Sequence, residues 1–280
     1  MYIAQQPFSL PALSVVEPND FPRAARVLHA RAGILLGTHK RDMAERTLGL
    51  RAKNVDLATV REYLDLLEQN PHSPEWETFV NAFTINHTAF FREQHHFEIL
   101  GDFVKTRTKP LSIWCAASST GEEPYSIAMT LQESCPQPAY GVSIIATDID
   151  TKAIERAKAG VYSMERVKPV PEDHLKKYFQ RGTGPREGMV RVKSVVRDMV
   201  QFDILNLQAP NWHAGEKFDA IFCRNTMIYF DKDTQTRILE RFAQVLKPGG
   251  LLFAGHSENF TYLTKAFRLQ GQTVYIVSET

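Results

Sequence analysis

The chain of 280 residues is 43% hydrophobic and 23% charged, and its formal net charge at pH 7 is +1. This length and composition suffice for one large globular domain and a smaller one, and they exclude a largely disordered chain. A charge so close to zero gives no global reason to expect a nucleic acid or a membrane as partner. No apolar run approaches the roughly 20 residues that cross a bilayer, and the three cysteines have no CxxC spacing. We therefore expect a cytoplasmic protein.

The first 109 residues are predicted to be mainly helical. After an N-terminal extension of residues 1–20, apolar residues recur every three or four positions in "RVLHARAGILLG" and "VREYLDLLEQN". Between Arg23 and Arg61 there are nine Lys or Arg and three Asp or Glu. A charge run of this kind is usually a solvated face.

Beyond Pro110 the pattern changes to alternating strands and helices. The predicted strands cover residues 111–117, 142–148, 199–205, 218–225, 250–255 and 273–278, and the predicted helices cover 122–134, 151–160 and 233–246. Right-handed crossovers between such strands give a mainly parallel, doubly wound sheet with helices on both faces. The segment 163–199 interrupts this alternation with a Gly/Pro turn between short β-like runs, which predicts an inserted hairpin or three-stranded subdomain.

The ligand of such a sheet binds beyond the carboxyl ends of its strands, near the point where strand order reverses. Asp148 lies at the tip of the second predicted strand, where a carboxylate can accept hydrogen bonds from ribose hydroxyls. The alternative is that Asp150 or Thr151 caps the next helix and that Asp148 is only a loop acid. The segments expected to meet at this edge are 115–123, 148–151, 206–207 and 224–230.

The turn after the first predicted strand, "AASSTGEE", has one glycine, Gly121, followed by Glu122 and Glu123. Thr120-x-x-Glu123 and Ser119-x-x-Glu122 both match the capping box of a helix start. Two carboxylates make this helix end a poor host for a pyrophosphate, and the absence of GxGxxG disfavours a nicotinamide dehydrogenase. A cofactor with a positive centre and no phosphate, such as S-adenosylmethionine (SAM), suits the turn better.

Four long motifs occur in a consistent order: "NAFTINHTAFFREQHHFEIL", "IWCAASSTGEEPYSIAM", "IIATDIDTKAIERAKAGVYS" and "FDAIFCRNTMIYFDKDTQTRILERFAQVLKPGGLLFAGHSENF". With them the chain resembles the CheR family of chemotaxis receptor glutamate O-methyltransferases from about Ala25 to the C-terminus. The resemblance implies a class I SAM-dependent methyltransferase domain, with a Rossmann-like doubly wound sheet, over residues 110–280. It also implies a small all-helical substrate-recognition domain with its linker over residues 21–109, and a β-subdomain inserted at about 163–199.

The resemblance further implies the residues of the site. Arg92 and Tyr229 would lie nearest the transferring methyl group and are the expected catalytic residues. The alternatives are that Arg92 is a solvated cation and that Tyr229 only packs its ring. The cofactor, SAM with its product S-adenosylhomocysteine (SAH), would be bound by Asn86, Thr88 and Arg92 from the linker, Glu123 at its methionine portion, Asp148 at its ribose, Asn206 and Leu207 at its adenine, and Arg224 and Asn225 at the tip of the fourth strand.

The expected partner is the cytoplasmic domain of a bacterial chemoreceptor, and the receptor would be the only link to the membrane. The segment "RGTGPREGMVRV" resembles the loop beside which a receptor C-terminal peptide adds as an extra strand. Its alternative is an ordinary hairpin turn. The residues expected at this contact are Gly182, Gly184, Arg186 and Gly188, with Arg181 and Arg191 nearby.

Three other functions remain open from sequence alone: a methyltransferase for RNA, one for a small molecule, and a SAM-binding sensor or scaffold without catalysis. The RNA alternative lacks clustered aromatic residues for stacking bases. No metal site is expected, since neighbouring side chains such as those of His95 and His96 diverge on a helix.

Overall fold

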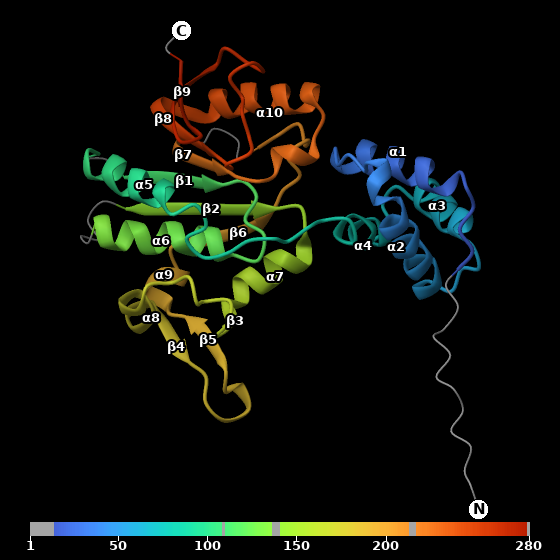
Figure 1. Cartoon of the computed structure of the whole chain (residues 1–280), viewed down its shortest axis with the longest axis horizontal. Helices are drawn as coiled ribbons and strands as arrows, with labels where there is room; N and C mark the ends of the chain where they lie inside the picture. The colour runs from blue at the N-terminus through green and yellow to red at the C-terminus, as the bar shows by residue number, and fades with distance from the viewer. Residues whose placement is uncertain (1–13, 108–109, 136–140, 213–216, 279–280) are drawn as a thin grey trace, which may run out of the picture. The chain divides into compact units, whose positions relative to one another are not determined.

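The computed structural model describes residues 14–107, 110–135, 141–212 and 217–278 (Figure 1). The chain divides into two compact units, Met1–Phe83 and Thr84–Thr280. Most of the predicted N-terminal extension and the predicted boundary at Lys109 lie outside the described residues. No helix of the described parts is both long enough and apolar enough to span a membrane.

The first unit is helical, as the periodicity predicts. It contains α1 (Asp20–Ala32), α2 (Arg41–Asn54), α3 (Val60–Gln69) and α4 (Glu75–Asn81), with a short 3-10 helix η1 (Thr38–Lys40) before α2. Leu28, Leu48, Leu64 and Phe79 are fully buried in this unit, which places an apolar stripe of each helix in its core.

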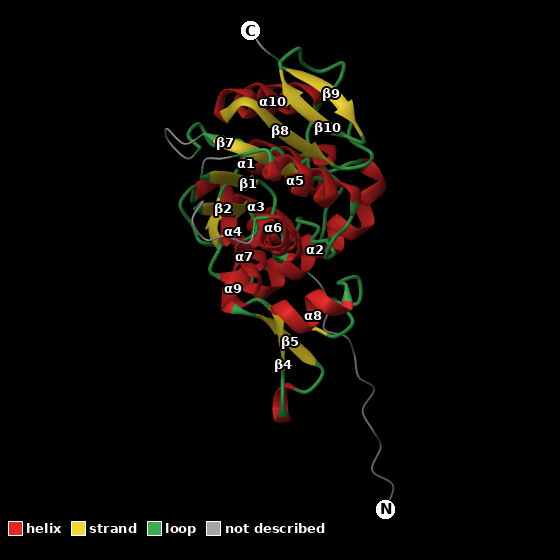
Figure 2. Cartoon of the chain, turned by 90° about the vertical axis from the view of Figure 1, so that its left-hand side faces the viewer, coloured by secondary structure: helices red, strands yellow, loops and turns green. Residues whose placement is uncertain are grey.

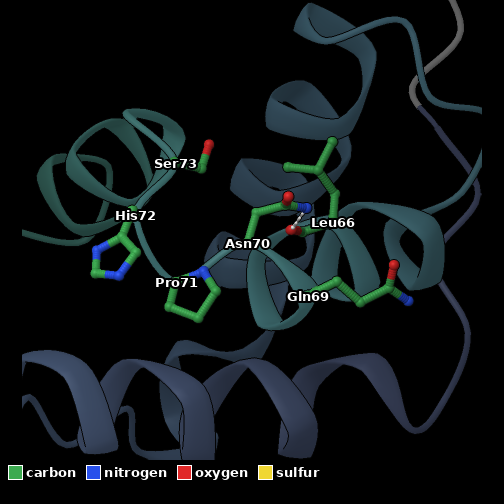
Figure 3. Close-up of a pocket in the computed structure, with 6 residues that line it drawn as sticks. All are labelled: Leu66, Gln69, Asn70, Pro71, His72 and Ser73. Atoms are coloured by element: carbon green, nitrogen blue, oxygen red, sulfur yellow. Dashed lines mark hydrogen bonds between the residues drawn. The ribbon is translucent and has the colours of Figure 1, made fainter.

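Ion pairs reduce the positive excess predicted for this unit. Arg23 pairs with Asp65 and Glu68, and Arg51 pairs with Glu75 at 2.6 Å. These carboxylates lie outside the stretch in which the charges were counted, so the count overstates the positive charge. A hollow of about 580 Å³ at the end of α3 is lined by Leu66, Gln69, Asn70, Pro71, His72 and Ser73 (Figure 3).

The second unit is built on a mixed sheet of seven strands in the order β6-β2-β1-β7-β8-β10-β9. Figure 2 shows β2, β1, β7 and β8 following one another up the view. The pairs from β6 through β8 are parallel, whereas β10 is antiparallel to β8 and β9. Strand order reverses at β1, the switch point expected to face the ligand. The strands are β1 (Leu111–Cys115), β2 (Val142–Asp148), β6 (Val200–Ile204), β7 (Phe218–Cys223), β8 (Leu246–Ala254), β9 (Phe267–Gly271) and β10 (Val274–Val277).

Helices cover both faces of this sheet because successive apolar residues of its central strands point to opposite faces. Ile113 and Cys115 join a core cluster with α5 (His95–Lys105), α6 (Glu122–Ser134) and α7 (Thr151–Ala159). Trp114 points to the opposite face and joins a second cluster with α10 (Lys232–Val245). Because α5 belongs to the first cluster, the segment from Thr84 onward forms part of the second unit, earlier in the chain than the boundary predicted at Lys109.

The inserted segment forms a small antiparallel sheet, the three-stranded form of the prediction. Its order is β3-β5-β4, and in Figure 1 the yellow hairpin of β4 and β5 projects from the second unit. Its elements are β3 (Val161–Ser163), α8 (Glu172–Tyr178), β4 (Phe179–Arg181), the 3-10 helix η3 (Gly184–Arg186), β5 (Met189–Val192) and α9 (Ser194–Arg197).

The C-terminal part of the large sheet differs from the prediction in two ways. β8 already begins at Leu246, so the predicted Pro-Gly-Gly turn lies inside the strand, where its register against β7 shifts between Phe218 and Ala220. β9 was not predicted at all. Its middle residues are exposed and mostly polar, "RLQ", so it shows no apolar alternation.

Candidate functional site

The carboxyl ends of four parallel strands meet at one edge of the large sheet. β1 pairs with β2 and β7, and β2 pairs with β6, each in parallel register. The loops that follow these strands therefore leave the sheet at the same edge. This confirms the predicted convergence of the segments 115–123, 148–151, 206–207 and 224–230.

Asp148 links two of these loops. Its carboxylate accepts hydrogen bonds from the backbone N–H groups of Ser119 at 2.7 Å and Asp150 at 2.9 Å. Asp150 caps α7 by accepting from the Ala153 N–H at 3.0 Å, as the alternative interpretation required. Burial raises the pKa of Asp148 to about 6.

The turn between β1 and α6 depends on its single glycine. Gly121 has φ of 97° and is the N-cap of α6, without a side-chain cap. A Cβ at this position would lie 2.8 Å from the Tyr162 hydroxyl. Both predicted capping boxes are therefore wrong. The left-handed conformation of Gly121 starts the helix after Ser119 and Thr120, and the Thr120 hydroxyl instead donates to the Glu122 side chain at 2.7 Å.

Each of the two buried glutamates at the start of α6 pairs with an arginine. Glu122 pairs with Arg166 at 2.7 Å. Glu123 accepts from Arg224 at 2.7 Å and lies 3.3 Å from the Cys115 thiol. Burial raises the pKa of both carboxyls, and the neighbouring guanidinium opposes this shift in each case. The acids therefore belong to fixed ion pairs and are not exposed charges at a helix end.

Arg224 connects three segments of this edge. It follows β7, its side chain is almost fully buried, and besides Glu123 it lies 3.2 Å from a carboxylate oxygen of Glu93. It also donates a hydrogen bond to the backbone carbonyl of Arg92. The loop after β7, the start of α6 and the segment before α5 are thus held by one guanidinium group.

The segment before α5 carries the other predicted cofactor contacts. Asn86 donates to Asp150 at 2.7 Å and accepts from the Ser119 hydroxyl at 2.7 Å, so it joins the loops after β1 and β2. Thr88 lies half-buried on the same segment. The half-buried Arg92 donates to the His87 carbonyl at 2.9 Å.

The other expected catalytic residue, Tyr229, belongs to the 3-10 helix η4 (Met227–Tyr229) and is half-buried. Burial raises its pKa, and the positive charge of Arg92 opposes that shift.

Asn206 and Leu207, predicted to lie beside the adenine, follow β6. Asn206 uses its side-chain oxygen to accept from the Gln208 N–H at 2.9 Å. The side chain of Leu207 is buried in the core cluster that contains Trp114. The Leu207 side chain therefore belongs to the hydrophobic core beneath this edge.

Glu258, which sequence reasoning missed, fixes the loop after β7. Its buried carboxylate accepts from the backbone N–H groups of Asn225, Thr226, Met227 and Gly255, at 2.9, 2.9, 2.8 and 2.6 Å. Asn225 has φ of 57°, a conformation that these bonds help to hold. The only sequence signal was an acid shortly after a buried strand, in "FAGHSEN".

The geometric argument against a metal at His95 and His96 was wrong. Their ring centroids lie 4.2 Å apart. Successive side chains of a helix differ by about 100° in direction, and at the first turn of α5 this still allows the two rings to touch.

The buried polar atoms at the site without a hydrogen-bond partner among the described residues include the Ser118 hydroxyl and Nε of Arg224. Buried polar groups are normally satisfied, so these atoms fit a polar ligand at this edge. A carboxylate acceptor at Asp148 and backbone brought close by small side chains also suit an adenosine-containing cofactor without phosphate.

Comparison with known proteins identifies the family. Residues 19–84 match the all-alpha domain of CheR methyltransferase, and residues 86–276 match its SAM binding domain. The chain belongs to the CheR methyltransferase family. This confirms the predicted fold class and SAM as the cofactor, and the individual contacts to SAM remain predictions.

Three relatives show the extent of the similarity to CheR proteins. The chemotaxis protein methyltransferase of Escherichia coli (strain K12) is 50% identical, over 92% of this chain and 91% of its own length. Chemotaxis protein methyltransferase 2 of Pseudomonas aeruginosa is 46% identical over 92% of both chains. Chemotaxis protein methyltransferase 2 of Vibrio cholerae is 34% identical over 91% of both.

The raised pKa of Asp148 predicts pH-dependent cofactor binding. Its carboxylate form, which is predicted to accept hydrogen bonds from ribose hydroxyls, is present above about pH 6 and is lost as the pH falls through that value. Calorimetry should therefore find SAH binding about tenfold weaker at pH 5 than at pH 7.5. Asp148→Asn should bind weakly at both pH values, whereas Asp203→Asn, an exposed acid on β6, should behave like wild type. An unchanged affinity in Asp148→Asn would remove Asp148 from the ribose site.

Proposed function

We propose that this CheR-family chain transfers the methyl group of SAM to glutamate side chains of bacterial chemoreceptors in the cytoplasm, giving methyl esters and SAH. The observation that carries the proposal is the convergence of Asp148, the Glu123–Arg224 pair and Arg92 at one sheet edge. The family match supports methyl transfer, and the names of its relatives support a chemotaxis protein as substrate.

The chemistry of a glutamate acceptor suits this site. A glutamate side chain, with a reference pKa of about 4.3, is already an anion at neutral pH, so no general base is required. In the described site the buried acids have other contacts: Glu122 and Glu123 form ion pairs with arginines, and Glu258 accepts backbone hydrogen bonds. Catalysis then consists mainly of positioning the carboxylate and excluding water.

When bound, SAM supplies an electrophilic methyl group on a sulfonium. A lone pair of the receptor carboxylate oxygen forms the new O–CH₃ bond while the electron pair of the breaking S–CH₃ bond returns to sulfur. Both formal charges disappear, so a dry site favours the transition state over the separated ions. Arg92, a half-buried cation before α5, would orient a carboxylate.

The helical unit is proposed to recognise the glutamate-rich receptor helix. Arg26 and Arg46 are exposed on α1 and α2, which leaves cations for electrostatic steering even though Arg23, Arg41 and Arg51 are engaged in ion pairs. A SAM sensor without catalysis remains the second candidate, and SAH binding without methyl transfer would favour it.

Replacement of Arg92 tests the catalytic assignment. Labelled methyl transferred from SAM to receptor-containing membranes should be released as methanol by mild base, the behaviour of a carboxyl methyl ester. Arg92→Ala should lower this transfer by about 10²-fold, because the group that orients the carboxylate is lost, and Arg92→Lys should lower it less. Arg156→Ala, an exposed arginine on α7, is the matched control.

Two outcomes would contradict this part of the proposal. Full transfer by an Arg92→Ala variant with an unchanged circular dichroism spectrum would exclude Arg92 from the site. Absence of base-labile label on receptors incubated with a wild-type chain that binds SAH would leave the sensor candidate.

We further propose that a receptor C-terminal peptide adds to the outer edge of β4. Among the described strands β4 pairs only with β5, so one edge has backbone groups available for an added strand. Arg181, Arg186 and Arg191 are exposed around this edge and suit an acidic peptide. In the turn itself, a Cβ on Gly182 would lie 2.2 Å from the Arg186 carbonyl oxygen, so the tight hairpin depends on that glycine.

Charge reversal at this edge tests the docking proposal. In the double variant Arg181→Glu with Arg186→Glu, affinity for a synthetic acidic receptor C-terminal peptide should fall about tenfold or more, as measured by fluorescence anisotropy. SAH affinity should be unaltered. The double variant Lys152→Glu with Lys158→Glu, at two exposed cations of α7, has the same change in net charge and is the control. Peptide binding equal to wild type in the double variant would exclude this edge.

A further inference from the structure

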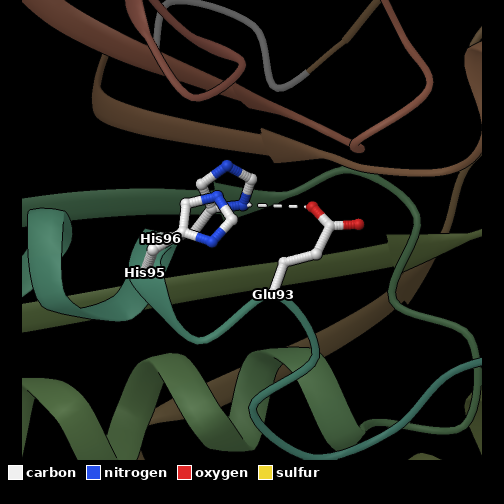
Figure 4. Close-up of side chains that lie close together, drawn as sticks. All are labelled: Glu93, His95 and His96. Carbon is white, nitrogen blue, oxygen red and sulfur yellow. Dashed lines mark ion pairs between the residues drawn. The ribbon is translucent and has the colours of Figure 1, made fainter.

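Three potential metal ligands come together where α5 begins (Figure 4). Glu93 lies just before the helix, and His95 and His96 are its first two residues. One ligand atom from each side chain can be chosen so that all three lie within 4.8 Å of one another. His96 is fully buried, whereas Glu93 and His95 are half-buried and have room to adjust.

The hydrogen bonds of His96 fix its tautomer. Its Nε2 lies 2.8 Å from the backbone carbonyl of Gln272, which can only accept, so Nε2 carries a proton. In the neutral ring the other nitrogen, Nδ1, then has a lone pair. This buried Nδ1 has no hydrogen-bond partner among the described residues and faces the Oε2 atom of Glu93 at 3.5 Å.

Two electron-pair donors thus face one another in a buried space. The neutral ring therefore has an unoccupied lone pair directed at a carboxylate. Unsatisfied buried groups of this kind are uncommon and call for an explanation such as a bound ion or water.

The charged groups around the site are the carboxylates of Glu93 and Glu123 and the single guanidinium of Arg224, which contacts both. The Glu93 oxygen that faces His96 is also the one that Arg224 contacts, so a bound cation would share this carboxylate with the guanidinium.

We propose that Glu93, His95 and His96 form a binding site for a divalent transition-metal cation of the zinc or cobalt class. Imidazole nitrogens with one carboxylate suit these ions, and three protein ligands leave the fourth tetrahedral position for water. Metal–ligand bonds of about 2.0–2.1 Å require Glu93 and His95 to move inward by roughly 1 Å. The half-buried His95 can turn inward, whereas Glu93 has to lengthen its contacts with Arg224 and the His256 N–H.

The outer contacts of the site are those of a metal centre. A metal-bound histidine usually donates its other N–H to a carbonyl or carboxylate, as His96 does to Gln272. The carboxylate of Glu93 is in turn held by Arg224 and by the His256 N–H at 3.2 Å. A bound ion would fix the start of α5 next to Arg92, and so stiffen the segment that carries Asn86 and Thr88.

Zinc and cobalt titrations of the untagged full-length chain test the proposal. Calorimetry should find one Zn²⁺ per chain, and Co²⁺ should give the visible absorption of a tetrahedral site. His95→Ala is the main test, because His95 is half-buried and its loss should spare the fold, whereas the buried His96 is a riskier change. Affinity for Zn²⁺ should fall at least tenfold in His95→Ala and in Glu93→Gln.

His72→Ala is the matched control, since His72 is an exposed histidine of the helical unit. It should bind Zn²⁺ like wild type. The proposal is overturned if the wild-type chain binds no stoichiometric Zn²⁺, or if His72→Ala weakens binding as much as His95→Ala does. Metal binding is measured here without turnover, so failure of this site would leave the proposed methyl transfer unaffected.

Discussion

The buried guanidinium of Arg224 is the interaction on which the cofactor edge depends. It contacts Glu123 at the start of α6, Glu93 before α5 and the backbone carbonyl of Arg92. Taking such charges out of water is costly, and the cost is offset only when each charge is paired and hydrogen-bonded. These three segments supply most of the predicted cofactor contacts. The correct position of each one therefore depends on the other two.

At this edge carboxylates shape the ligand-binding loops, a role that a glycine-rich loop has in phosphate-binding folds. Asp148 and Glu258 accept backbone N–H groups from the loops after β1, β2, β7 and β8, and thereby fix the loops from within. Such an arrangement suits a cationic cofactor without phosphate and repels a pyrophosphate. It also explains why two glutamates follow Gly121: Glu122 binds Arg166 of the inserted segment, and Glu123 binds Arg224.

The sequence correctly predicted those features of the fold that local residue patterns determine. Apolar runs located β1, β2 and β7, and parallel topology then placed Asp148 and Arg224 at one edge. The prediction failed where contacts between residues far apart in the sequence determine the structure. The hydrogen bonds of Glu258 reach residues more than 30 positions earlier, and no sequence periodicity indicates them. The capping-box pattern was overridden by the left-handed Gly121, and β9 lacked apolar alternation because its residues face solvent. The rings of His95 and His96 meet because of their place at a helix start.

The role of Arg224 is tested most directly by a double-mutant cycle on the free energy of unfolding in urea. Arg224→Met should cost about 3–5 kcal/mol, because it leaves buried carboxylates without a cation. Adding Glu123→Gln to Arg224→Met should recover part of that loss, since one of those charges is then removed. A coupling energy above about 1 kcal/mol would support the account. Strictly additive effects would contradict it, since the edge would then be held by other contacts.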